Sequence, residues 1–101
     1  MVKIYKDGSA AFTSANSDTT VYKVSANRVF YLTNVAVAND EASNILVTLF
    51  DGAGGDKKAY IIAPADDTKP IKTRIKFTDS VVAQVNTYTD GSYITISGYE
   101  E

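Results

Sequence analysis

Residues that branch at Cβ dominate the apolar part of this chain. Ten valines and eight isoleucines stand against three leucines, and eleven threonines and seven tyrosines accompany them. Such side chains suit a pleated, half-buried surface. No stretch places apolar residues at i, i+3, i+4 and i+7 behind a capping residue, so no helix longer than a turn is expected. The sequence therefore predicts an all-β chain.

Size and composition limit what the chain can be and do. Its 101 residues are 45% apolar and 22% charged, with a net charge of -2, which describes one ordinary soluble domain. No run approaches the roughly 20 apolar residues of a membrane span, and the first residues lack the apolar core of a signal peptide. We therefore expect no membrane partner and no secretory precursor.

The chain contains no cysteine and no histidine. Without cysteine and histidine, the 101 residues cannot build a disulfide, a zinc site, a haem ligand, a cysteine nucleophile or a histidine-based triad. Most enzyme chemistry is excluded, and we expect a non-enzymatic protein without a cofactor. Paired carboxylates could still support glycoside hydrolysis, but most of the aspartates fall in expected turns, where their side chains cap the backbone.

Short runs of strand-forming residues alternate with turn residues along the chain. A long run, 28–38, is expected to contain a bulge or bend near Thr33-Asn34. In the run 45–50, apolar and polar residues alternate too little for one face to be fully exposed to solvent, so this strand is expected to be central in its sheet. The expected strands are residues 2–5, 20–24, 28–38, 45–50, 57–63, 71–77, 81–88 and 93–99.

About eight short strands in a hundred residues imply a two-layered sandwich or a barrel, because a single sheet would leave one apolar face wet. The first expectation is a single-domain antiparallel β-sandwich that is jelly-roll-like. An immunoglobulin-like sandwich comes second, although the buried tryptophan and paired cysteines that mark antibody domains are absent. Strand order is left open, because sandwich topologies share one alternating pattern.

The N-terminal residues differ in character from the rest. We expect residues 1–18 to form a short edge strand, closed by the turn pair Asp7-Gly8, and an arm, with residues 19–101 forming the sandwich domain. The segment 9–18 is small and polar with one large apolar residue, Phe12. Phe12 either anchors the arm on a partner or packs into its own domain. On the first interpretation, deletion of residues 1–18 leaves a folded domain that no longer binds. The acidic tail, Glu100-Glu101, is expected to stay in solvent.

One expected strand carries a basic stripe. Alternation puts Lys72, Arg74 and Lys76 on one face and apolar residues on the other, with charges recurring roughly every 6.5 to 7 Å. Such a stripe suits an acidic protein surface or a phosphate backbone. The alternative is a solvated face whose cations discourage edge pairing. Nucleic acid is not expected, because the chain is net acidic and shows no aromatics clustered beside the cations. The candidate partner-binding residues are Phe12, Lys72, Arg74 and Lys76.

Several other groups have simpler interpretations. The glycine-rich loop 51–56 lacks the alternate oxygen ligands and closing glutamate of an EF-hand and the spacing of a phosphate loop, so a flexible hairpin is expected. A weak surface calcium site remains the alternative there, and the pairs Asp40-Glu41 and Asp66-Asp67 are interpreted as turn residues. The seven tyrosines are spread along the chain, which favours half-buried structure over a sugar-stacking platform.

Three segments together resemble small β-sandwich virion proteins of tailed bacteriophages and some archaeal viruses. They are residues 20–37, the strand end Leu49-Phe50-Asp51-Gly52, and the stretch from Pro70-Ile71 to the closing residues 94–101. The resemblance implies a capsid decoration protein on the outer surface of the shell, bound to the major capsid protein or another virion protein. It further implies a symmetric homo-oligomer, for which we expect a trimer. The alternative is a receptor- or carbohydrate-binding module of a spike or tail fibre, with a sugar site on its loops.

Overall fold

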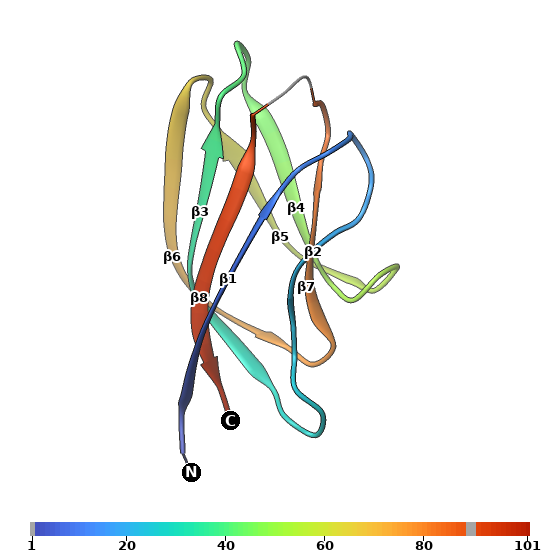
Figure 1. The fold of residues 1–101 in the computed structure, drawn as a ribbon, viewed down its shortest axis with the longest axis vertical. Coiled ribbons are helices and arrows are strands. Elements are labelled where there is room, and N and C mark those ends of the chain that lie inside the picture. Colours follow the sequence, from blue (N-terminus) through green and yellow to red (C-terminus); the bar gives the residue numbers. More distant parts are fainter. Residues whose placement is uncertain (1, 89–90) are drawn as a thin grey trace.

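The computed structural model describes residues 2–88 and 91–101, which form strands and turns (Figure 1). No helix of these residues is long and apolar enough to cross a membrane. The two ends of the chain lie at the same end of the elongated domain (Figure 1). The strands are β1 (Ile4–Ala11), β2 (Thr19–Lys23), β3 (Phe30–Asn39), β4 (Ile45–Asp51), β5 (Asp56–Ala63), β6 (Asp67–Phe77), β7 (Ser80–Val85) and β8 (Tyr93–Glu100).

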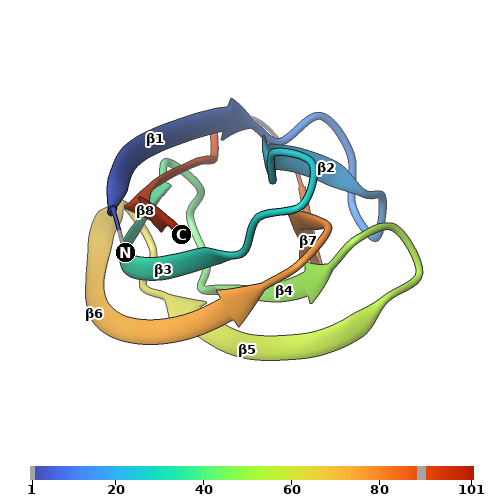
Figure 2. The same ribbon diagram turned by 90° about the horizontal axis from the view of Figure 1, so that it is seen from below.

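The strands form two four-stranded sheets, ordered β1-β8-β3-β6 and β2-β7-β4-β5. Strand β4 pairs with β5, β3 with β6, β2 with β7 and β1 with β8, all antiparallel. The chain is thus one long hairpin whose successive strand pairs alternate between the sheets as it rolls up (Figure 2). This is the topology of a jelly roll. The expected jelly-roll-like sandwich is confirmed, and strand order excludes the immunoglobulin-like alternative.

The core lies between the sheets and follows from period-two alternation along each strand. On β3 and β4 every second side chain is buried, and on β8 the even-numbered residues face inward. Burying each large apolar side chain contributes about 1.5–3 kcal/mol relative to exposure. The largest fully buried apolar side chains are Phe12, Phe30, Leu32, Val37, Ile45, Val47, Leu49, Phe77, Val81, Ile94 and Ile96.

Strand β1 does not stop at Asp7-Gly8, so the expected turn there is wrong. Every residue of the strand pairs with β8, and Gly8 lies opposite Ile96. A Cβ atom at Gly8 would lie 2.7 Å from the carbonyl oxygen of Val21. Glycine is therefore required here because β2 passes close by, and a continuous partner strand outweighs the local turn preference of the Asp-Gly pair.

Phe12 is a core residue, which corrects the hypothesis that it anchors an arm on a partner. Its side chain is only 2% exposed, and its backbone N–H donates to the carbonyl oxygen of Ser92 at 3.0 Å. The interpretation that Phe12 packs into its own domain is the one the structure supports. Strand β1 belongs to the first sheet, so Ile4–Ala11 is part of the sandwich.

The other strands lie close to their expected positions. The register of β3 shifts between Leu32 and Asn34 in both of its ladders, which confirms the bulge, and β4 is an inner strand as expected. Strand β6 begins at Asp67 and includes Pro70, where a loop was expected. An edge strand tolerates proline because its outer side has no ladder to interrupt.

Candidate functional site

The basic stripe is present on β6, at an edge of the first sheet. Lys72, Arg74 and Lys76 are exposed and alternate with partly or fully buried residues. The guanidinium of Arg74 lies over the ring of Tyr31, 5.2 Å from its centroid. Lys76 lies opposite Tyr31 in the ladder, and Lys72 lies opposite Asn34. The three cations therefore share a face but have different neighbours.

Beside the stripe, three tyrosines from distant parts of the chain form a row across the outer face of the first sheet. Tyr5, Tyr99 and Tyr31 are register partners on β1, β8 and β3. The Tyr31 and Tyr99 rings stack with centroids 5.3 Å apart, and Tyr5 meets Tyr99 edge-on at 6.2 Å. The ammonium of Lys3 lies 4.6 Å above the Tyr99 ring. Cations thus border an aromatic row, and such contacts stabilise it.

This tyrosine row was missed by sequence reasoning, which treated the tyrosines as dispersed. Positions 5, 31 and 99 are far apart in the chain, and only the strand order of the jelly roll makes them neighbours. The single available signal was that each lies on the outward side of an expected strand. Without strand order and register, that signal does not distinguish a cluster from three separate residues.

A hollow of about 590 Å³ lies next to the tyrosine row on the same face. Two rows of register partners cross it: Asp7, Ser97, Asn34 and Lys72, and then Ser9, Thr95, Ala36 and Pro70. Small side chains in the middle of a sheet leave this space open. We call it the first-sheet hollow; its lining residues are Asp7, Asn34, Val35, Ala36, Pro70, Ile71, Lys72, Thr95, Ile96 and Ser97.

The outer face of the second sheet has a different character. Leu46 and Phe50 point outward from β4 and are half-buried, in line with the weak alternation of this segment. On the neighbouring edge strand β5, Tyr60 is 61% exposed and Ile62 is 62% exposed. Ile62 is the register partner of Leu46. These four residues form an outer apolar strip on the face opposite to the first-sheet hollow.

Acidic residues gather at the loop end of the sandwich. Asp40, Asp66 and Asp67 line a second hollow of about 390 Å³ together with Tyr93. Glu41 is buried, and its carboxylate accepts a hydrogen bond from the Ser92 hydroxyl at 2.9 Å. Among residues 2–88 and 91–101, no three His, Cys, Asp or Glu side chains are placed to hold a metal ion together.

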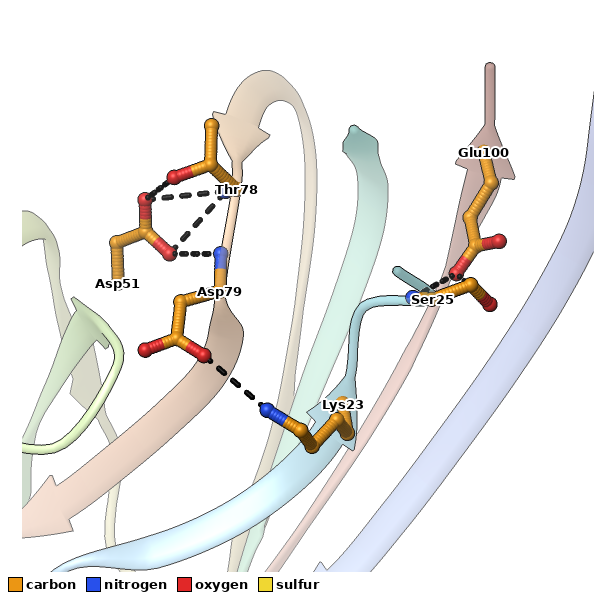
Figure 3. Close-up of polar contacts among 6 residues, drawn as sticks. All are labelled: Lys23, Ser25, Asp51, Thr78, Asp79 and Glu100. Carbon is orange, nitrogen blue, oxygen red and sulfur yellow. Dashed lines mark hydrogen bonds and ion pairs between the residues drawn. The ribbon is translucent and has the colours of Figure 1, made fainter. Parts of the chain in front are cut away.

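The glycine-rich segment after β4 forms the expected hairpin to β5, with Asp51 and Asp56 as register partners. Both carboxylate oxygens of Asp51 accept hydrogen bonds from the turn between β6 and β7, given by the backbone of Thr78 and Asp79 and by the Thr78 hydroxyl (Figure 3). Burial raises the pKa of Asp51, but these hydrogen bonds outweigh it and leave the pKa below its usual value. Asp51 therefore ties two turns together.

Glu100 is buried, and the expectation that the acidic tail stays in solvent is wrong for this residue. It is 1% exposed. Its Oε2 atom accepts hydrogen bonds from the backbone N–H and the hydroxyl of Ser25, both at 3.0 Å (Figure 3). The same atom accepts a hydrogen bond from the Tyr22 hydroxyl. Burial raises the pKa of Glu100, but these bonds and the charge of Lys6 lower it below its usual value overall. Burial, together with the hydrogen bond to Glu100 and its negative charge, raises the pKa of Tyr22 to about 12.

We expect Glu100 to make stability fall with acidification. Its folded-state pKa is lowered, so its contribution is present above the unfolded-state value of about 4.3 and is lost as the pH falls through the folded-state pKa. Glu100→Gln should destabilise the protein by about 1.5–3 kcal/mol near neutral pH. Urea unfolding near neutral pH and below about pH 4 measures whether the difference from the unsubstituted protein shrinks in acid. Glu101→Gln is the matched control, and an equal loss for Glu100→Gln at both pH values would contradict the expectation.

Comparisons with known proteins bear on the fold. No family model and no curated protein matches this chain. One similar solved structure is a protein of the Bacillus endospore appendages, described as a family of disulfide-linked pili. It is 14% identical, with a TM-score of 0.57 over 98% of this chain and 90% of that one. The likeness shows the fold.

A second similar structure is the carbohydrate-binding module CBM6cm-2 of Cellvibrio mixtus lichenase 5A, in complex with cellotriose. It is 13% identical, with a TM-score of 0.53 over 98% of this chain and 86% of that one. The chain is a single-domain β-sandwich, as both comparisons indicate. At 13–14% identity, both likenesses show the fold alone.

Proposed function

We propose that this chain is a non-enzymatic virion protein that decorates the outer surface of a capsid and docks through the outer apolar strip. The exposure of Tyr60 and of Ile62, whose register partner is the half-buried Leu46, carries the proposal. Contiguous exposed apolar surface marks a protein contact, and tyrosine is enriched at such contacts. A sandwich face offers a rigid surface that can bury this strip across a subunit boundary.

Charge around the strip indicates the chemistry of the partner. Lys57 and Lys58 are exposed on β5 at one end of the strip, and Lys57 lies 5.9 Å from the centroid of the Tyr60 ring. Strand β6 runs along the same border of the sandwich as β5 (Figure 2). Its basic stripe, however, faces the outer side of the first sheet, where Lys72 lines the hollow, so Lys57 and Lys58 are the cations beside the strip. An apolar strip with cations at one end fits an apolar shell surface edged with carboxylates. The major capsid protein is the partner we propose, with the module present as a symmetric trimer.

One of the comparisons refines the proposal. The pilus protein with this fold belongs to a disulfide-linked assembly, whereas these 101 residues contain no cysteine, so they cannot be held on a shell by a disulfide. The alternative role, a carbohydrate-binding module of a spike or fibre, is favoured by a separate observation, the first-sheet hollow. The strip and the hollow lie on opposite faces, so both roles can belong to one protein.

Cosedimentation tests the docking role. Shells from the virus that carries this gene, prepared without the protein, are mixed with the purified chain and separated on a density gradient. We expect the chain to sediment with the shells, and light scattering of the unbound protein to give a trimer mass. The double variant Tyr60→Ser, Ile62→Ser should bind at least about tenfold more weakly, because buried aromatic anchors dominate such contacts.

The double variant Val2→Ser, Tyr5→Ser is the matched control, since it removes two exposed apolar side chains, 76% and 77% exposed, away from the strip. Its shell binding should be unchanged. Shell binding that is absent for the unsubstituted chain, or unaffected by the Tyr60 and Ile62 changes, would overturn the docking role.

A further inference from the structure

The geometry of the first-sheet hollow points to a ligand site: we propose that it binds a short, neutral oligosaccharide. The hollow has about 590 Å³, within the range of small-molecule sites. It opens on the sheet face, whereas the sequence had suggested a sugar site on loops. The site does not depend on docking through the outer apolar strip.

Aromatic side chains lie beyond both ends of the hollow. Tyr99 and Tyr93 both point outward from β8, with Ser97 and Thr95 between them. The two tyrosines are six positions apart on an extended strand, which corresponds to about 20 Å. At one end, Tyr31 stacks on Tyr99 and Tyr5 meets Tyr99 edge-on. These neighbours leave Tyr99 only 7% exposed, so Tyr5, which is 77% exposed, offers the open ring there. At the other end, Tyr93 is 52% exposed. This spacing suits an extended chain of a few sugar rings better than a single ring.

The polar groups of the hollow match hydroxyl groups. Asp7 accepts hydrogen bonds, Lys72 donates them, and the hydroxyls of Thr95 and Ser97 do both. Among residues 2–88 and 91–101, the side chains of these four residues make no hydrogen bond or ion pair with another residue. The backbone carbonyl of Ser97 accepts a hydrogen bond from the Thr33 hydroxyl at 3.3 Å, which leaves the Ser97 hydroxyl free for a ligand. A sugar offers donors and acceptors in equal measure, and its C–H faces pack on the apolar floor of Ala36, Pro70 and neighbouring residues.

Charge favours a neutral ligand over a nucleic acid, although cations do lie beside aromatics here. Arg74 and Lys3 are positioned over tyrosine rings. Lys72 is the cation among the lining residues, and the carboxylate of Asp7 shares the hollow with it. A phosphate backbone needs several unopposed cations along its path. The hollow instead pairs one charge of each sign.

Calorimetric titration tests the site with named probes: trimers of β-1,4-linked glucose, N-acetylglucosamine and mannose, with oligo(dT) and a sulfated heparin fragment for comparison. We expect saturable binding of at least one neutral trimer and none of the two polyanions. Ala36→Arg fills the middle of the hollow and should abolish binding. Asn34→Ala, on an exposed residue, should weaken it roughly tenfold.

The matched control is Thr48→Arg, which places the same side chain on an inner strand of the opposite sheet, where Thr48 also points outward and is half-buried. Circular dichroism verifies that each variant is folded. The site would be overturned if the Ala36→Arg variant and the Asn34→Ala variant were both folded and both bound the sugar as tightly as the unsubstituted protein. It would also be overturned if the protein bound only the polyanions, or if it bound none of the neutral trimers at millimolar concentration. Shell binding is measured separately, so the two proposals fail independently.

Discussion

Replacing Phe12 with alanine is expected to destabilise the protein by about 3–5 kcal/mol, because it removes a ring that is 2% exposed and leaves a cavity between the sheets. A domain of this size has a total stability of about 5–15 kcal/mol, so the loss is a large fraction of it. Urea unfolding measures the change. The chain has no tryptophan, so tyrosine fluorescence and far-ultraviolet circular dichroism serve as the two signals.

Phe50→Ala provides the control, since Phe50 is a phenylalanine that lies half-buried on the outer face of β4. Its loss should be clearly smaller than that of Phe12→Ala. Deletion of residues 1–18 should have a still larger effect, because it removes all of β1 and leaves the edge of β8 unpaired. A cooperatively folded truncated chain, or a Phe12→Ala loss no greater than that of Phe50→Ala, would contradict the assignment of Phe12 to the core.

Replacing Gly98 with alanine should cost about 3 kcal/mol or more, the upper range for forcing atoms into a packed region. Gly98 lies on β8, an inner strand, opposite Leu32 at the bulge of β3. A Cβ atom there would overlap the carbonyl oxygen of Tyr31 and lie 2.7 Å from the Phe30 ring. Neither neighbour can move freely, because one is ladder backbone and the other is a fully buried ring. The measurement is the urea midpoint relative to the unsubstituted protein.

Gly54→Ala separates this overlap from the general cost of replacing a glycine. Gly54 has a φ of +69° in the β4–β5 hairpin, and a Cβ atom there meets nothing within 4 Å. Its substitution should cost only about 1–2 kcal/mol, from the left-handed backbone alone. If the two alanine variants were equally stable, close backbone approach would not be the reason for glycine at position 98.

The two surfaces of this molecule follow from how a sandwich distributes its outward side chains. On the first sheet these include charged, hydroxyl and aromatic residues around a hollow, and on the second they include the apolar strip. The carboxylates of Asp51 and Glu100 fix the turns and chain end at one end of the sandwich (Figure 3). Asp51 thereby joins the β4–β5 hairpin to the turn between β6 and β7, and Glu100 joins the end of β8 to Ser25.

Local sequence pattern was sufficient for the fold class and for most strand positions. Alternation placed Lys72, Arg74 and Lys76 correctly on the outward side of their strand. The length of the third strand correctly predicted its bulge. These features depend on neighbours within a few residues of one another. The physical reason is that successive side chains of a strand point to opposite faces, so the local sequence determines which side of the strand is buried.

Tertiary structure alone decided which strands are neighbours, and with it the two candidate surfaces. Tyr5, Tyr31 and Tyr99 meet only because β8 pairs with both β1 and β3. Pairing with β8 also keeps the chain extended through Asp7-Gly8, where the local sequence predicts a turn. Contacts with Tyr22 and Ser25 bury Glu100, which the local sequence predicts to be exposed. Strand order depends on contacts between residues distant in sequence, which a local alternating pattern does not encode, because many orders bury the same apolar side chains equally well.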